Sequence, residues 1–164
     1  MIIIGEKING SIPPVAKAIA EKDAEFIKHR AQIQADANAT YIDCCASVEE
    51  SIEVETLHWM IDLIQEVTDV PICIDSPSPH SCVAAIPFCK KPGLINSVSM
   101  EGDKIDVIFP VIADTKWECV ALLCDDKGIP NSVERRMEVF HNVMEKAKEY
   151  GIAPSRLPVS YTHL

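Results

Sequence analysis

Five short runs rich in Ile and Val recur along the chain, and segments with helical patterns separate them. The runs lie at residues 2–4, 41–44, 70–74, 94–95 and 119–124, and polar residues, Gly or Pro border them. Short apolar runs of this kind are typical of strands that are buried on both faces of a sheet. A chain that passes through a helix before each new strand builds parallel βαβ units. The alternation therefore predicts an α/β fold.

The clearest helical pattern lies near the end of the chain. The pair Asn131 and Glu134 has the spacing of a capping box, and Gly151 is a typical stop signal. Between them, apolar residues at helical spacing predict the buried face. This stripe consists of Val133, Met137, Phe140, Met144, Ala147 and Tyr150.

Three further segments are expected to be helical. Ser47 and Glu50 form a second possible capping box, and apolar residues then repeat at helical spacing from Leu57 to Val67. Residues 23–37 and 104–113 carry weaker patterns, and the second of them contains Pro110, which kinks a helix or marks an edge strand.

The loop after the first predicted strand helps to choose between a closed barrel and an open sheet. It reads Gly5-Glu6-Lys7-Ile8-Asn9-Gly10, which lacks both the dinucleotide-binding fingerprint and the P-loop pattern. A (β/α)8 barrel remains, and a complete one needs about 250 residues. The 164 residues are therefore expected to form about five parallel βα units of a partial TIM barrel.

Charge and cysteine content exclude several classes of function. Fifteen Lys and Arg against 25 Asp and Glu give a formal net charge of -10, which repels nucleic acid and anionic membranes. Without a signal peptide or an apolar run of about 20 residues, a cytoplasmic location is expected. The seven cysteines are odd in number and lack a Cys-x-x-Cys pair, so neither a disulfide framework nor a closed zinc site is expected. They are Cys44, Cys45, Cys73, Cys82, Cys89, Cys119 and Cys124.

Polar residues follow every predicted strand, and in a parallel barrel these positions meet at one rim. A carboxylate there can accept two parallel N–H bonds from a flat amidine-like edge, such as that of a pterin, while amides pair with the remaining groups. The alternative is that Asp43, Asp75 and Asp125 cap the following helices. No His accompanies the acids, so a metal site is not expected. The rim residues are Glu6, Lys7, Asn9, Asp43, Asp75, Ser76, Asn96, Ser97, Asp125 and Asp126.

Four of these segments resemble the methyltetrahydrofolate:corrinoid methyltransferases, pterin-binding enzymes of the dihydropteroate synthase-like superfamily. The segments are residues 3–10 and the motifs Cys73-Ile74-Asp75-Ser76, Leu94-Ile95-Asn96-Ser97 and Asp125-Asp126-Lys127-Gly128-Ile129-Pro130, and the resemblance covers roughly residues 1–157.

The resemblance implies a set of pterin-binding residues. Asp75 is expected to take the amidine edge and Asn96 a ring nitrogen or the oxo group, with Glu6, Asn9 and Asp43 near the same pocket. At strand two the family tends to carry an Asn two residues after the Asp, whereas this chain has Cys45.

The implied reaction moves the N5-methyl group of methyltetrahydrofolate to the cobalt of a corrinoid, a cobalamin-type group carried by a partner protein. The Asn that stabilises charge at N5 in the family is expected beyond residue 164, so no catalytic residue is identified in this chain. Homodimers are common in the family. The reaction belongs to one-carbon metabolism.

The resemblance ends before the chain does. Residues 1–157 are expected to form the N-terminal part of the barrel domain, and residues 158–164 a non-native or disordered tail in place of a strand that closes on Asp-Pro-Leu. Such an incomplete barrel exposes unpaired edges, so oligomers and weak methyltetrahydrofolate binding are expected. Two alternatives stand beside the methyltransferase. One is a dihydropteroate synthase-like enzyme, although residues 10–14 do not contain the loop motif of that enzyme. The other is a non-catalytic binding or assembly module.

Overall fold

The five apolar runs form five parallel strands in the sheet order β1-β2-β3-β4-β5, as the alternation predicts. The structure is a computed structural model and describes residues 2–160. Each strand leads through at least one helix to the next strand, and together they form a curled half-barrel. The strands are β1 (Ile4–Gly5), β2 (Tyr41–Cys45), β3 (Ile72–Asp75), β4 (Leu94–Met100) and β5 (Glu118–Asp125).

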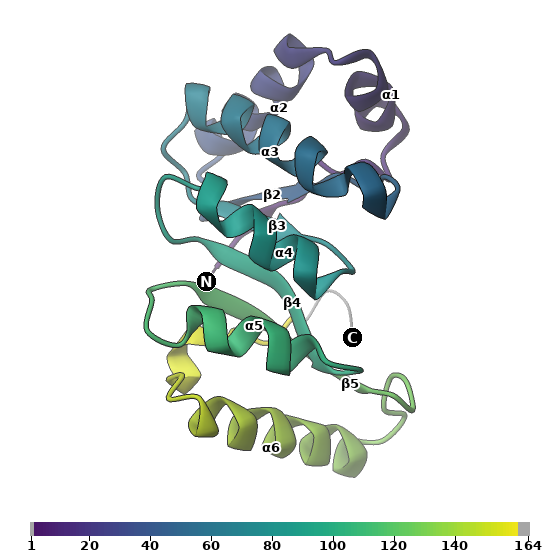
Figure 1. Ribbon diagram of the computed structural model, residues 1–164, viewed down its shortest axis with the longest axis vertical. Helices are drawn as coiled ribbons and strands as arrows, with labels where there is room; N and C mark the ends of the chain where they lie inside the picture. The colour runs from purple at the N-terminus through teal and green to yellow at the C-terminus, as the bar shows by residue number, and fades with distance from the viewer. Residues whose placement is uncertain (1, 161–164) are drawn as a thin grey trace.

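The helices lie on the outer side of the sheet and follow one another along the long axis, from α1 and α2 at one end to α6 at the other (Figure 1). They are α1 (Pro13–Glu21), α2 (Ala24–Asp36), α3 (Glu50–Val67), α4 (Pro79–Ala85), α5 (Lys104–Ile112) and α6 (Val133–Glu149), with short 3-10 turns at η1 (Ile86–Phe88) and η2 (Pro154–Arg156).

The core between the sheet and the helices is apolar. Its sheet side includes Ile42, Ile74 and Ile95, which are fully buried, and its helix side includes Ile61 and Phe109. A second, smaller cluster lines the inner face of the curl and consists of Tyr41, Cys73, Leu94 and Val120, with Ile4 and Leu122 packed against it. Strand residues alternate between these two environments, as a period of two requires.

Helices α2, α3 and α5 confirm the expected segments, and Pro110 lies inside α5 at an exposed position. Helices α1 and α4 were not expected, because each is short and begins with Pro, a residue typical of loops. β1 is shifted from the expected residues 2–4 to Ile4–Gly5, since it lies at a sheet edge and pairs only with β2. Ile2 and Ile3 stay about half exposed there.

Both predicted capping boxes are wrong. The hydroxyl of Ser132, one residue after Asn131, accepts the Arg135 backbone N–H and caps α6. Ser47 precedes α3 in a left-handed conformation, with a φ of 48°, and the helix starts after Glu49 without a side-chain cap.

The predicted stripe of α6 is correct only in its later part. Val133 and Met137 are 74% and 44% exposed. The face that packs on the sheet instead centres on Val139, Val143 and Ala147, with Phe140, Met144 and Tyr150 partly buried beside it. The first turns of α6 therefore extend past the edge of the core.

The segment after α6 is packed against the barrel. The Arg156 guanidinium donates to the carbonyl oxygens of Ile112, Ala113 and Trp117, which joins η2 to the connection between α5 and β5. Val159 then forms a parallel bridge with Ala121. Residues 158–160 are thus paired with β5. Residues 161–164 of the expected tail lie outside the described residues, and its non-native origin stays a prediction.

Within residues 2–160, no helix combines the length and apolar composition that crossing a bilayer requires. The seven cysteines are free thiols in the structure.

Candidate functional site

A row of polar side chains crosses three strands at the carboxyl rim of the inner face. In the strand register, Cys45 of β2 lies opposite Asp75 of β3, and Asp75 lies opposite Asn96 of β4. Residues directly opposite each other on parallel strands project to the same face of the sheet. Asp75 and Asn96 therefore share the inner rim, where parallel barrels place their chemistry.

Asp43 lies one step deeper on the same face, opposite Cys73, and is only 1% exposed. Burial raises the pKa of its carboxyl well above the ordinary value, and the nearby charges of Asp75 and Glu6 raise it further. Hydrogen bonds with Cys73 and Asn96 lower that pKa in part. The Asp43–Asn96 contact passes across β3, as expected when alternate strands fill one layer of a barrel.

One oxygen of Asp43 has no partner. Its Oδ1 is buried and accepts no hydrogen bond from any described residue. Buried carboxylate oxygens rarely remain unpaired, because desolvation without compensation costs about 1–3 kcal/mol or more. The inner face thus holds an acceptor that a ligand with N–H groups can satisfy.

Asn9 belongs to a second group of polar residues, in the loops after β1 and β2. Its Oδ1 accepts the Ser11 backbone N–H at 2.8 Å and lies 3.4 Å from Ser47 Oγ. Ser47 Oγ in turn lies 3.1 Å from Ser11 Oγ and 3.3 Å from the Cys45 sulfur. Asn9 is therefore linked to the rim row through Ser47 and Cys45.

The backbone brings these two loops into close contact. Gly10 donates its N–H to the Cys45 carbonyl at 2.9 Å. A Cβ at Gly10 would lie 2.0 Å from the Ala46 carbonyl oxygen, so only glycine permits this approach. The loop that carries Asn9 is thereby fixed against the end of β2.

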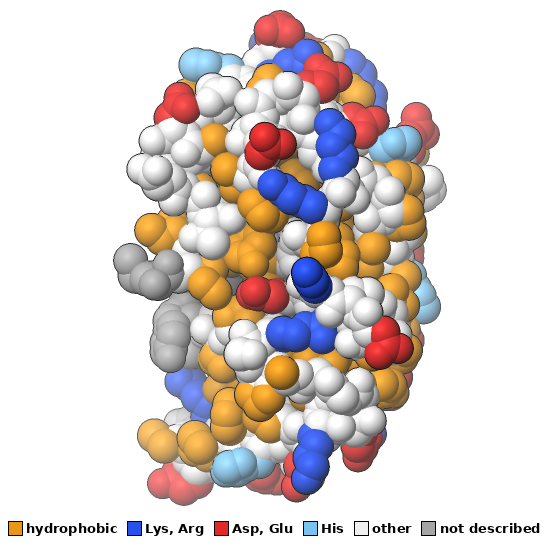
Figure 2. Space-filling model, turned by 90° about the vertical axis from the view of Figure 1, so that its left-hand side faces the viewer, with side chains coloured by type: hydrophobic (Ala, Val, Ile, Leu, Met, Phe, Trp, Pro, Cys, Tyr) orange, Lys and Arg blue, Asp and Glu red, His pale blue; other side chains and the backbone are white. Residues whose placement is uncertain are grey.

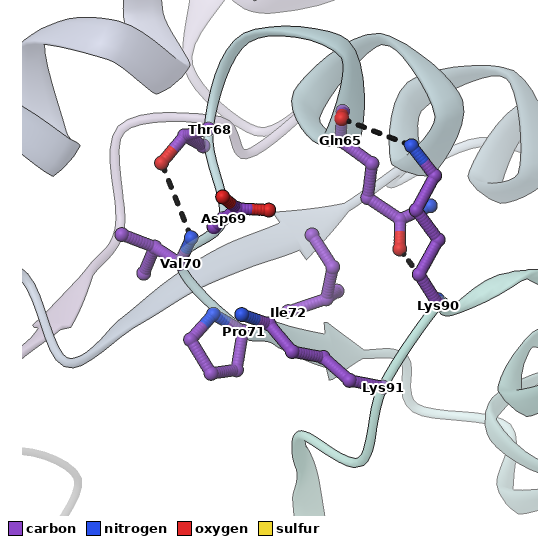
Figure 3. Close-up of a pocket in the computed structure, with 8 residues that line it drawn as sticks. All are labelled: Gln65, Thr68, Asp69, Val70, Pro71, Ile72, Lys90 and Lys91. Atoms are coloured by element: carbon purple, nitrogen blue, oxygen red, sulfur yellow. Dashed lines mark hydrogen bonds between the residues drawn. The ribbon is translucent and has the colours of Figure 1, made fainter.

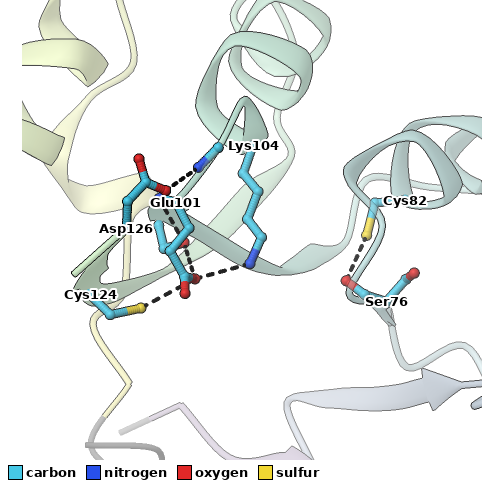
Figure 4. A network of polar contacts seen from close by, with 8 residues as sticks. Ser76, Cys82, Glu101, Lys104, Cys124 and Asp126 are labelled. Carbon is cyan, nitrogen blue, oxygen red and sulfur yellow. Dashed lines mark hydrogen bonds and ion pairs between the residues drawn. The ribbon is translucent and has the colours of Figure 1, made fainter. Parts of the chain in front are cut away.

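A third polar group lies at the ends of β4 and β5 (Figure 4). The Glu101 carboxylate accepts from Ser99 Oγ at 2.7 Å, from Lys104 Nζ at 3.2 Å and from Cys124 Sγ at 3.5 Å. The hydrogen bond from Ser99, followed by those from Lys104, lowers the pKa of Glu101. Asp126 accepts the Gly102 N–H at 2.9 Å and fixes the same loop.

The structure thus brings together three of the predicted site residues, Asp43, Asp75 and Asn96. Glu6 is near enough for its charge to act on Asp43, and Asn9 is joined to the row indirectly. The capping alternative is wrong for Asp43 and Asp75, because both lie within strands and Ser78 caps α4.

Asp125 does not cap α6 either; it pairs with Arg135. It lies with Asp126 beside an open cavity of about 280 Å³ on the outer part of the rim. The predicted rim residue Ser76 is also engaged, since its hydroxyl donates to the buried carboxylate of Glu53 at 2.8 Å.

Two members of these polar groups, Glu101 and Ser47, were not among the predicted rim residues. The apolar run predicts a strand only at residues 94–95, whereas β4 continues to Met100, so Glu101 is the residue that follows it. The Glu-x-x-Lys spacing of Glu101 and Lys104 is a signal that points to this pair.

The opposite, amino end of the barrel has a different character. A small cavity of about 80 Å³ lies there, beside the start of β3 (Figure 3). Two hydrogen bonds join residues of its lining: Gln65 Oε1 accepts the Lys90 N–H at 2.7 Å, and Thr68 Oγ1 accepts the Val70 N–H at 3.2 Å. Figure 2 shows this end, where Lys and Arg side chains are scattered among hydrophobic ones. Nothing in it resembles the buried unpaired acceptor of the rim.

Among residues 2–160, no three His, Cys, Asp or Glu side chains gather closely enough to hold a metal ion.

Comparisons with known proteins agree with this geometry. The model of the pterin-binding enzyme family matches residues 15–159. A methylcorrinoid:tetrahydrofolate methyltransferase of Eubacterium limosum is 53% identical over 161 residues, which are 97% of this chain and 59% of that protein. The chain therefore spans about three fifths of the length of this relative.

Solved structures show the same fold. A dihydropteroate synthase from Xanthomonas albilineans in complex with 7,8-dihydropteroate has a TM-score of 0.64 at 21% identity, covering 96% of this chain and 57% of that one. A dihydropteroate synthase from Coxiella burnetii in complex with pteroic acid has a TM-score of 0.65 at 18% identity, with the same coverage. The half-barrel, its rim of acids and amides and the match over residues 15–159 lead to one assignment: this chain belongs to the pterin-binding enzyme family.

Proposed function

We propose that the chain carries part of the pterin site of a methyltransferase that moves a methyl group between N5 of tetrahydrofolate and the cobalt of a corrinoid protein. The observation that carries this proposal is the buried, unpaired Oδ1 of Asp43 beside Asp75 and Asn96. The name of the 53% identical relative supports the two substrates.

Each residue of the rim has a role that its chemistry suits. The Asp75 carboxylate is proposed to accept two parallel N–H bonds from the amidine edge of the pterin. Asn96 offers both a donor and an acceptor for a ring nitrogen or the oxo group. Asp43 supplies a further acceptor below them, while Glu6 and the loop of Asn9 border the pocket.

The direction of transfer is part of the proposal. The sequence resemblance implies methyltetrahydrofolate as the donor, whereas the relative is named with the methylcorrinoid first. One pocket serves both directions, because a catalyst lowers the barrier for a step and for its reverse alike. The corrinoid supplies the cobalt that gives or takes the methyl group, and the residues of this chain hold the pterin so that N5 faces it.

The partner and the setting are proposed on the same grounds. A separate protein carries the corrinoid, the enzyme works in the cytoplasm in one-carbon metabolism, and the complete protein forms a homodimer. Nucleic acid and membrane partners are not expected at a formal net charge of -10.

A dihydropteroate synthase-like activity is the second candidate, and it is favoured only by the shared fold. The third candidate is a non-catalytic binding or assembly module.

Transfer of an isotope-labelled methyl group separates these candidates. The chain is incubated with labelled methyltetrahydrofolate and a reduced corrinoid protein, and in a second arm with a labelled methylcorrinoid protein and tetrahydrofolate. Transfer in either arm that is lost in Asp75→Asn supports the methyltransferase. Condensation of a pterin with p-aminobenzoate supports the second candidate, and ligand binding without turnover in any arm supports the third.

A further inference from the structure

Cys45 lies where the rim row meets the loop network of Asn9, Ser11 and Ser47. Its side chain is 7% exposed and projects to the inner face, opposite Asp75. It lies 3.3 Å from Ser47 Oγ and also hydrogen-bonds to Asp75.

The thiol is a hydrogen-bond donor at neutral pH. Burial raises the pKa of Cys45 to about 12, and the charges of Asp75 and Asp43 act in the same direction. The sulfur therefore keeps its proton, which can be donated to the Asp75 carboxylate, and the Ser47 hydroxyl can donate to the sulfur. A neutral S–H is a weak donor and leaves most of the acceptor capacity of the carboxylate for a ligand.

We propose that Cys45 is a positioning residue, whose thiol fixes the orientation of the Asp75 carboxylate for the flat donor edge of a pterin. This inference rests on the proposed function. The buried, unpaired Oδ1 of Asp43, next to the same two residues, independently marks the pocket as one that takes a ligand with donor groups. Ser47 and Asn9 hold the thiol in turn, so the loop after β1 acts on Asp75 through Cys45.

The test compares three variants of the full chain in their affinity for tetrahydrofolate, measured by calorimetry under anaerobic conditions. Cys45→Ala removes the donor and is expected to weaken binding about fivefold, because the charged acceptor brings the weak thiol donor to ordinary hydrogen-bond strength. Cys45→Ser keeps a donor and is expected to stay within about twofold of the parent chain. Cys44→Ala is the matched control, since Cys44 is fully buried on the outer face of the same strand. It should lower stability and leave affinity unchanged.

Asp75→Asn separates failure of this inference from failure of the proposed function. If Asp75→Asn weakens binding strongly and Cys45→Ala does not, Cys45 does not position Asp75. Equal losses in Cys45→Ala and Cys45→Ser also overturn the inference, because they show that sulfur packing matters and the donor does not. If Asp75→Asn binds as well as the parent chain, the pterin site itself is wrong.

A second measurement needs no ligand. The infrared S–H stretch of Cys45, isolated by subtracting the spectrum of Cys45→Ser, reports the strength of its hydrogen bond. Asp75→Asn replaces a charged acceptor with a neutral one and should shift this band to higher frequency. A band that stays in place contradicts a hydrogen bond between the two residues.

Discussion

The two faces of the same three strands differ in what they bury. On the outer face, Ile42, Ile74 and Ile95 are fully buried against the helices and bring no polar side-chain atoms with them. On the inner face, the neighbouring positions are Asp43, Asp75 and Asn96, and one Asp43 oxygen has no partner. Successive strand residues point to opposite faces, so apolar packing and polar groups alternate from one residue to the next. Packing on the outer face thereby supports the polar groups on the inner face.

The difference shows how the barrel tolerates an unfavourable site. A buried carboxyl with an unpaired oxygen lowers stability, whereas each buried aliphatic side chain adds about 1.5–3 kcal/mol. The outer face therefore holds the strands in register, and the inner face can present groups suited to a ligand. Substitutions on the two faces should accordingly change different quantities.

The largest expected effect comes from the outer face. Ile42→Ala removes a fully buried side chain from β2 and should lower the free energy of unfolding by about 2–5 kcal/mol. Urea denaturation measures this loss. At temperatures where the variant is folded, tetrahydrofolate affinity should equal that of the parent chain. A variant that keeps its stability but loses affinity would reverse the roles of the two faces.

The next effect comes from the inner face. Asp75→Asn removes the charged acceptor proposed for the pterin edge and should weaken tetrahydrofolate binding about 10- to 100-fold, because hydrogen bonds to charged groups contribute about 1.5–3 kcal/mol. Calorimetric titration measures the change. Asp126→Asn is the matched control, since Asp126 belongs to the outer part of the rim and contacts Gly102. Equal losses in the two variants would point to net charge and not to the site.

These contrasts also explain what the sequence could predict. The alternation of apolar runs and helical stripes determines the fold class, and the position of Asp43, Asp75 and Asn96 near strand ends follows from it. The contacts of Ser47 with Ser11 and of Cys124 with Glu101 join residues 36 and 23 positions apart. They depend on strand register and on loop conformation, including the left-handed Ser47, which local patterns do not specify.

Helix ends were harder to predict for a similar reason. Asn131 and Ser132 are both good N-cap residues, and the choice between them depends on how α6 docks on the sheet. The exposed Val133 and Met137 follow from that docking, since the helix begins before the core does. Amphipathic pattern alone does not show where a sheet ends.

A third effect should depend on pH. The pKa of Asp43 is raised in the folded chain, so the folded state binds this proton more tightly than the unfolded state does. The contribution of Asp43 is therefore most favourable below its unfolded pKa of about 3.9 and is lost as pH rises through the folded pKa. Asp43→Asn should not show this loss, and its stability relative to the parent chain should rise by up to about 1.4 kcal/mol per pH unit within that window.

Thermal unfolding of both chains between pH 4 and pH 9 measures this difference. Asp69→Asn serves as the control, because Asp69 lies in the loop before β3 at the amino end, away from the rim. A difference between Asp43→Asn and the parent chain that does not change with pH would show that the carboxyl is not held in its neutral form.

The smallest effect tests the edge of the rim, where polar groups are no longer buried. Lys104→Met keeps most of the side-chain stem and removes the ion pair with Glu101, whose partners are 26% and 38% exposed. Solvent screening limits the loss to about 0.5 kcal/mol.

The pKa of Glu101 is lowered in the folded chain, so the contribution is present above its unfolded pKa and disappears as pH falls through the folded value. Urea denaturation at pH 7 and at pH 3, with and without added salt, should show a small difference at pH 7 and low salt that decreases at pH 3 and with added salt. A loss of several kcal/mol that persists at pH 3 would mean that Lys104 holds the β4–α5 loop by packing, and that this part of the rim resembles the outer face more than the inner one.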